Sequence, residues 1–119
     1  PQVVVELLMD EMKYFNKEHF RIVLLNTKNQ IISIEEISVG NLNSSIVHPR
    51  EVFNIAIRRS ANSIILVHNH PSGDSTPSKE DINITYRLVE VGNIIGIKVL
   101  DHIIIGDNNY MSFRDKNII

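Results

Sequence analysis

The residues best suited to chemistry lie in the stretch HNHPSGDSTPSKED, residues 68–81. His68 and His70 stand two positions apart, and the run continues after seven residues with Ser78 and, three positions later, Asp81. Side chains alternate along a β-strand, so both histidines would project from one face while Asn69 points the other way. Their spacing of roughly 7 Å along a strand would let both imidazoles bind one ion at the ~2.0–2.1 Å of zinc–nitrogen bonds.

The Ser-x-x-Asp part of this stretch has two interpretations. Taken alone, Ser78 followed by Asp81 before an amphipathic run is a capping box, in which the serine begins a helix and the aspartate bonds back to it. Taken with the histidines, Asp81 supplies a third ligand from the first turn of that helix. Four positions at fixed spacing would match by chance in about one such chain in a thousand, which favours the metal site.

The same residues carry a family resemblance. HNHPSGDSTPSKED resembles the His-x-His-x7-Ser-x-x-Asp signature of JAMM (MPN-plus) metalloproteins, and together with HPREVF and DHIIIG it is similar to the RadC family, often described as DNA repair proteins. The resemblance covers roughly residues 17–114 and implies an α/β fold, a three-layer α-β-α arrangement with a mixed sheet, like that of cytidine deaminases. Deaminase chemistry is excluded, because those sites use cysteine ligands and this chain has no cysteine.

The resemblance also implies a metal site and an activity. His68, His70 and Asp81 would hold one zinc ion with water in the fourth position, which is the arrangement of a catalytic zinc. The expected activity is that of a zinc-dependent hydrolase, in which metal-activated water attacks a peptide, isopeptide or related amide bond. The Ser78 hydroxyl would hydrogen-bond the bound water or the developing oxyanion.

Such a hydrolase needs a general base within reach of the water, and two glutamates are candidates. JAMM proteins use a glutamate on the first strand, which by position is Glu18, just ahead of FRIVLL. Without the resemblance, Glu18 is predicted to be a solvated residue between a helix and a strand. Glu51 is the rival, although an acidic residue in the first turn of a helix is explained by the helix dipole.

Two aspartates and a histidine near the motif have structural and functional interpretations. Asp101 and His102 alternate on an expected strand, so only one of them should face the interior. Asp101 could support a ligating histidine, although a structural role is the commoner case. Asp74 lies in the loop after His70 and is expected to be a turn residue.

Composition narrows the function classes. The chain has 119 residues, no cysteine, and a net charge of −2 from 12 basic and 14 acidic residues. Disulfides, thiolate nucleophiles and cysteine-ligated zinc are excluded, and the missing basic surface argues against direct nucleic-acid binding. The one basic pair, Arg58–Arg59, fits a helix C-terminus. No apolar run approaches the ~18 residues of a membrane span, and a cytoplasmic location is expected.

Hydrophobic periodicity predicts alternating helices and strands. A helix is expected over residues 3–15, a β-hairpin over 19–26 and 31–40, a loop over 40–45, and a helix from Pro49. Residues 62–70 read as a strand buried on both faces. A further helix should begin after Ser78 and end just before Gly92, followed by strands at 95–106 and 110–113.

These observations lead to one expected domain and two hypotheses of function. Residues 1–119 would form a single RadC-like JAMM domain, the C-terminal part of a longer protein. The leading hypothesis is the zinc hydrolase acting on a peptide or protein substrate, with loops 40–47 and 71–77 setting specificity. The alternative is a non-catalytic interaction module in a DNA-repair or mobile-element context. Residues 110–113 could pair between two copies to form a homodimer.

Overall fold

The computed structural model describes residues 2–40 and 47–119. The predicted loop at 40–45 lies, apart from Gly40, outside the described residues. The elements along the chain are α1 (Gln2–Met12), β1 (His19–Leu25), β2 (Ile31–Val39), α2 (Pro49–Arg58), β3 (Ser63–Asn69), α3 (Lys79–Ile95), β4 (Lys98–Ile105) and β5 (Tyr110–Ser112).

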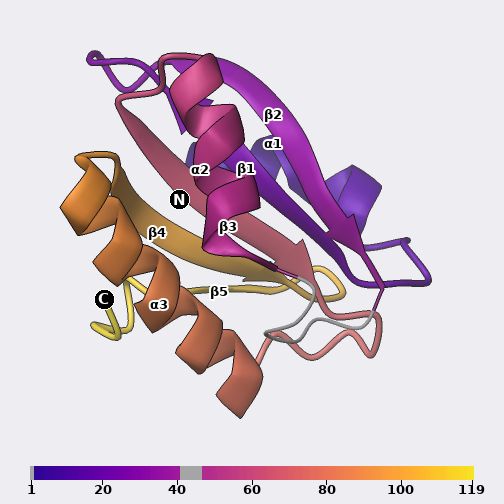
Figure 1. The fold of residues 1–119 in the computed structure, drawn as a ribbon. Helices are drawn as coiled ribbons and strands as arrows, with labels where there is room; N and C mark the ends of the chain where they lie inside the picture. The colour runs from indigo at the N-terminus through magenta and orange to yellow at the C-terminus, as the bar shows by residue number, and fades with distance from the viewer. Residues whose placement is uncertain (1, 41–46) are drawn as a thin grey trace.

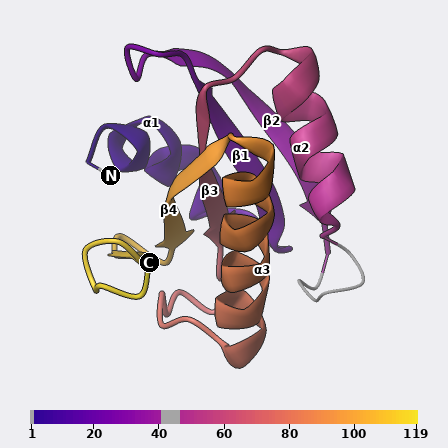
Figure 2. The same cartoon turned by 60° about the vertical axis from the view of Figure 1, so that its left-hand side comes forward.

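The strands form one mixed sheet in the order β2-β1-β3-β4-β5. β1 and β2 form the predicted antiparallel hairpin, β3 pairs antiparallel with β1 and parallel with β4, and β5 pairs antiparallel with β4. α1 covers one face of the sheet while α2 and α3 cover the other (Figures 1 and 2). The predicted three-layer α/β fold is confirmed.

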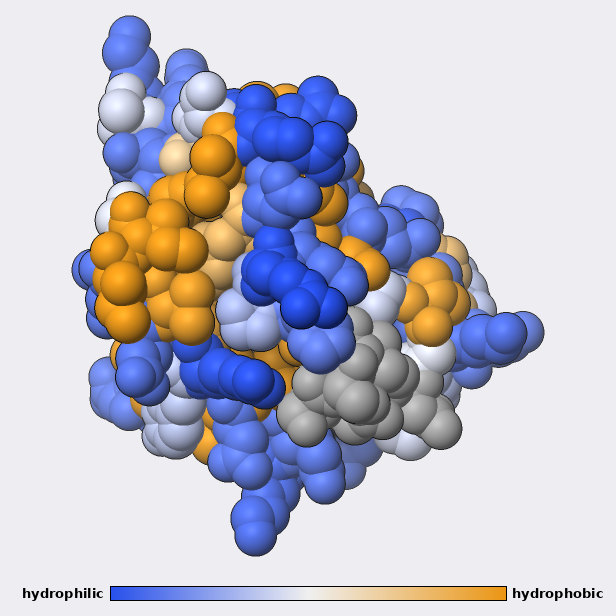
Figure 3. All heavy atoms as spheres, in the orientation of Figure 1, coloured by the Kyte–Doolittle hydropathy of each residue, from blue (hydrophilic) through white to orange (hydrophobic). Residues whose placement is uncertain are grey.

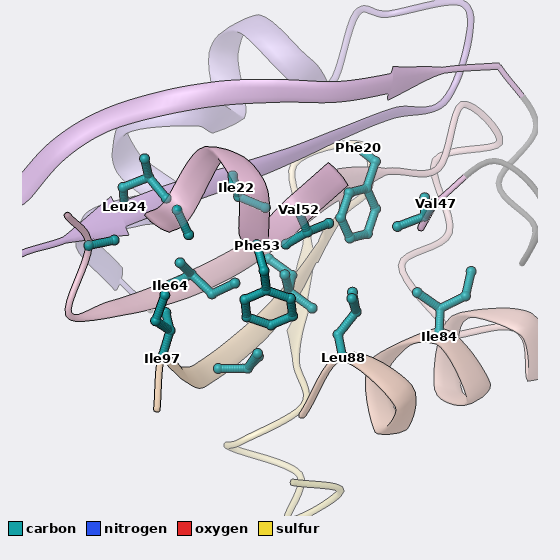
Figure 4. Close-up of a cluster of buried hydrophobic side chains, with 14 residues drawn as sticks. Phe20, Ile22, Leu24, Val47, Val52, Phe53, Ile64, Ile84, Leu88 and Ile97 are labelled. Atoms are coloured by element: carbon teal, nitrogen blue, oxygen red, sulfur yellow. The ribbon is translucent and has the colours of Figure 1, made fainter. Parts of the chain in front are cut away.

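β3 is the central strand, and all seven of its residues are buried. Alternation along the strand divides its side chains between two cores. Ile64 and Leu66 join the core under α2 and α3, where Phe53 and Leu88 also pack (Figure 4). Ile65 and Val67 join the core under α1. The prediction of a strand buried on both faces is therefore confirmed, and it places His68 on the α3 side of the sheet.

Two predicted helix ends are wrong. α1 ends at Met12, three residues earlier than the periodicity suggested. α3 continues through Gly92 to Ile95 and is capped by Gly96, whose φ of 90° is left-handed. A Cβ at position 92 would lie 2.5 Å from the Ile97 carbonyl oxygen and 3.3 Å from the Phe53 ring. Gly92 is thus a close-packing position inside the helix, and Gly96 is the C-terminal glycine.

Exposed apolar side chains gather at the C-terminal end of α3. Ile94 is 79% exposed and Ile95 is 43% exposed, and Figure 3 shows apolar atoms over this end of the helix. This patch lies at the opposite end of α3 from Asp81, so it is separate from the predicted metal site.

Among the described residues, no helix is both long enough and apolar enough to cross a membrane.

Replacing Gly92 with alanine tests the close packing of α3. Overpacking costs about 1–3 kcal/mol, and the better helix propensity of alanine returns up to about 1 kcal/mol. We therefore expect Gly92→Ala to lower the free energy of unfolding by about 1–2 kcal/mol in a urea titration. The exposed neighbour is the control, and Asn93→Ala should stay within about 0.5 kcal/mol of the parent. A Gly92→Ala variant as stable as the parent would contradict this packing.

Candidate metal centre

Three of the predicted site residues meet where β3 ends and α3 begins. His68 lies near the end of β3, His70 follows that strand, and Asp81 lies in the first turn of α3. The Nε2 atom of His68 is 3.1 Å from Nε2 of His70 and 3.1 Å from Oδ1 of Asp81. Nε2 of His70 is 3.0 Å from Oδ2 of Asp81. The three side chains therefore aim their donor atoms at one point.

This cluster fits a divalent metal ion. A tetrahedral ion with bonds of 2.0–2.1 Å separates its ligand atoms by about 3.3 Å, a few tenths of an ångström more than the observed spacing. The side chains of His68 and Asp81 are 0% and 3% exposed, and that of His70 is 12% exposed. Buried carboxylates are paired or coordinate metals, and among the described residues this cluster has the composition and spacing for the second role.

The Ser78–Asp81 pair is a complete capping box as well. The Ser78 hydroxyl accepts a hydrogen bond from the Asp81 amide at 3.1 Å. In return, Oδ2 of Asp81 accepts from the Ser78 amide at 2.8 Å. The helix start therefore fixes the position of the carboxylate that faces the histidines, and both interpretations of Ser-x-x-Asp describe the same geometry.

The electrostatics keep the Asp81 carboxylate charged. Burial tends to raise the pKa of Asp81, but contacts with His68, His70 and the Ser78 amide outweigh it and hold this pKa well below its usual value. Burial tends to lower the pKa of His70, yet the contacts with Asp81 and the Asp74 carbonyl raise it overall. An ionised Asp81 is the form that binds a metal.

The loop after β3 orients His70. Nδ1 of His70 donates to the Asp74 backbone carbonyl at 2.8 Å, which leaves Nε2 to face the cluster. The Asp74 carboxylate accepts from the amide and the hydroxyl of Thr76, so its prediction as a turn residue is confirmed. The sequence pattern did not indicate the contact between its carbonyl and His70.

Asp101 and His102 are both buried, at 2% and 0% exposure, so the prediction that only one faces inward is wrong. β4 lies between β3 and β5, and both faces of the sheet are covered, so both side chains are enclosed. Asp101 accepts from the Ser112 hydroxyl and from the amides of His102 and Arg114. Its role is structural.

His102 is the residue that contacts a predicted ligand. Its Nε2 lies 2.7 Å from Nδ1 of His68. Burial and the neighbouring His68 lower the pKa of His102 well below the usual histidine value. The sequence showed only a polar residue in an apolar strand, and the parallel register that pairs Leu66 with His102 was not readable from it.

Asn69, between the two histidines, holds the segment that carries Glu18. Its side chain is buried on the other face of β3, where Oδ1 accepts from the His19 amide at 2.7 Å and Nδ2 donates to the Lys17 carbonyl at 3.0 Å. The Glu18 carbonyl accepts from the Gly40 amide at 2.8 Å. The residues on both sides of Glu18 are thus attached to β3, the strand that carries His68.

Glu18 also lines a surface depression that reaches Pro71, the residue after His70. The depression has a volume of about 530 Å³ and is lined by Asn16, Lys17, Glu18, Val39, Gly40 and Pro71. The negative charge of Glu18 makes a small contribution to the raised pKa of His70, after those of Asp81 and the Asp74 carbonyl. Glu51 is exposed in the first turn of α2, where its amide donates to the His48 carbonyl. Glu18 therefore lies in the segment bonded to β3, whereas Glu51 lies on α2.

A three-layer α/β domain with a His-His-Asp cluster beside its central strand belongs to the JAB/MPN class. More narrowly, the chain belongs to the RadC-like JAB domain family, whose model matches residues 1–118. It is 67% identical over 116 residues to a UPF0758 protein of Caldanaerobacter subterraneus, covering 98% of this chain and 50% of the relative.

Two further UPF0758 relatives show similar matches. The chain is 64% identical to the UPF0758 protein of Alkaliphilus metalliredigens, and the match covers the whole chain and 51% of that relative. It is 60% identical to the UPF0758 protein of Desulfitobacterium hafniense, and this match covers the whole chain and 52% of that relative. The chain therefore spans about half the length of the relatives it matches, and their names state no activity.

Ser78→Ala tests the capping box. Losing an N-cap hydroxyl costs about 1 kcal/mol, so we expect the free energy of unfolding of the metal-free protein to fall by about that amount. Ser78→Thr keeps a hydroxyl at this position and should restore most of the loss. Equal stability of the alanine and threonine variants would show that the hydroxyl does not cap α3.

His70→Ala tests the cluster as a metal site. A metal that binds only the folded state at a hundredfold excess over its dissociation constant stabilises by about 2.7 kcal/mol. We expect added Zn²⁺ to raise the thermal midpoint of the parent protein and to leave His70→Ala nearly unchanged.

The matched control for this test is His48→Ala. His48 is the N-cap residue of α2, and its side chain makes no capping hydrogen bond. This variant should respond to the metal as the parent does. An equal response from all three proteins would place metal binding elsewhere.

Proposed function

We propose that this domain is a zinc-dependent hydrolase that cleaves a peptide, isopeptide or related amide bond. The observation that carries the proposal is the convergence of His68, His70 and Asp81 on one point, with Glu18 and an open depression beside it. A ligand cluster next to a carboxylate and a surface hollow is the arrangement a metal-assisted hydrolysis requires.

The donor set supports zinc. Two imidazole nitrogens and one carboxylate oxygen are ligands that zinc accepts, and three protein ligands leave one position open in a tetrahedral site. When bound, zinc would lower the pKa of a coordinated water and polarise a substrate carbonyl. The His70 side, at 12% exposure, is the most accessible part of the cluster.

The remaining steps fall to Glu18 and Ser78. Glu18 would take a proton from the attacking water and pass it to the leaving amine nitrogen. The capping box uses Ser78 Oγ as an acceptor, so the hydroxyl proton remains to be donated to the carbonyl oxygen as negative charge develops there. Capping and catalysis would use opposite sides of the same oxygen atom.

The substrate would be a peptide or protein segment. The depression beside Glu18 is also lined by Asn16, Lys17, Val39, Gly40 and Pro71, and its polar side chains would hydrogen-bond the amide groups of a peptide. Because the domain spans about half of its relatives, the substrate of the whole protein is part of this proposal. The net charge of −2 does not favour nucleic acid as the ligand.

Glu18→Gln tests the general base. The variant should bind Zn²⁺ like the parent, while hydrolysis of a peptide library falls by about 10²–10⁴-fold, because the amide cannot accept the proton. Glu51→Gln is the matched control and should retain activity. Retained activity in Glu18→Gln with loss in Glu51→Gln would move the base to Glu51. A zinc-loaded parent that cleaves nothing in the library would favour the non-catalytic interaction module instead.

A further inference from the structure

We propose that His102 and Thr85 are positioning residues that determine which nitrogen of His68 carries its proton, and thereby keep Nε2 of His68 bare for the metal. The inference rests on the proposed metal site, but not on the hydrolysis. Neither residue is a ligand, and both are 0% exposed.

A continuous line of buried hydrogen bonds joins His68 to the backbone of α3. Nδ1 of His68 lies 2.7 Å from Nε2 of His102. Nδ1 of His102 lies 2.5 Å from the Thr85 hydroxyl oxygen. The Thr85 hydroxyl in turn donates to the Asp81 backbone carbonyl at 2.6 Å. β3, β4 and α3 each contribute to this line.

The direction of every bond follows from its last member. A backbone carbonyl can only accept, so the single Thr85 proton points to Asp81. The Thr85 oxygen then accepts from Nδ1–H of His102, which leaves Nε2 of a neutral His102 as an acceptor. A neutral His68 must donate to that acceptor through Nδ1–H, and its Nε2 is left without a proton. The opposite direction would bring two unprotonated oxygens within 2.6 Å of each other.

Both histidines therefore carry their proton on Nδ1 and leave Nε2 bare, but different hydrogen bonds fix this in each. His70 donates directly to a backbone carbonyl, that of Asp74. His68 reaches a backbone carbonyl through two side chains, and that carbonyl belongs to Asp81, the third ligand. These hydrogen bonds join His68 to the backbone of Asp81, whose side chain also faces His68. The orientation of His68 therefore depends on the same helical turn that places the carboxylate.

Aromatic packing fixes the plane of the His102 ring. The ring stacks on Phe113 with centroids 4.7 Å apart and an interplanar angle of 21°. Phe20 meets it edge-on at 5.8 Å. A ring held on two sides cannot turn to offer its nitrogens elsewhere, and a water-excluded environment strengthens the hydrogen bonds it makes.

Thr85→Val is the main test, because it removes the hydroxyl and keeps the shape of the side chain. In the metal-free protein at pH 8, ¹⁵N NMR of the imidazoles should show His68 as the Nδ1–H form in the parent. The form should shift toward Nε2–H in Thr85→Val. Zinc affinity, measured against a competing chelator, should fall about 10-fold, at the low end of the range for groups that support metal ligands. Thr85→Ser restores the hydroxyl and should restore both readouts.

His102 variants give a second measurement. His102→Leu removes the acceptor and should weaken zinc binding by about 10–100-fold. His102→Gln can still accept through its amide oxygen and should recover part of the loss. Should the leucine variant fail to fold in a thermal melt, the comparison of Thr85→Val with Thr85→Ser still decides the question.

Two results would overturn the inference. One is an Nε2–H form of His68 in the metal-free parent. The other is a Thr85→Val variant whose His68 form and zinc affinity both match the parent. Failure of the proposed function looks different: a parent that binds zinc but cleaves nothing removes the hydrolase proposal alone, whereas a parent that binds no zinc removes the metal site on which both rest. Zinc affinity that changes as expected in a protein without hydrolytic activity would leave this inference standing.

Discussion

The carboxylate of Asp81 is the group on which the rest of the site depends. Its Oδ2 accepts from the Ser78 amide at the start of α3 and also lies 3.0 Å from His70, while Oδ1 faces His68. One side chain thus joins the first turn of a helix to the end of the central strand. The distance between helix and strand and the distances between ligands are therefore set by the same group, and neither can change alone.

The parts of the fold and site that could be predicted depend on local patterns. Alternation along the strand predicted at 62–70 placed His68 and His70 together, and the Ser78–Asp81 spacing marked the start of α3. Both are rules of backbone geometry over a few residues, so they hold before any tertiary packing is known. The central position of β3 followed from an unbroken apolar run, because only a strand covered on both faces needs one.

The parts that were missed depend on how separate elements meet. His102 contacts His68 only because β3 and β4 pair in parallel with Leu66 opposite His102. Thr85 contacts His102 because α3 packs over that pair of strands. Gly92 looked like a helix end, yet its role is set by the Ile97 carbonyl and the Phe53 ring against it. Strand register and the packing of a helix against strands or another helix depend on residues far apart in the sequence, so a short stretch of sequence does not reveal them.

The Asn69 side chain has a consequence for how this domain can diversify. Its two hydrogen bonds attach the residues flanking Glu18 to the strand that also carries His68 and His70. The spacing between Glu18 and the histidines is therefore built into neighbouring backbones. Segments that take no part in these bonds, unlike residues 17–19 and the turn at 70–74, can change in length and composition while the distance from Glu18 to the His-His-Asp cluster is kept.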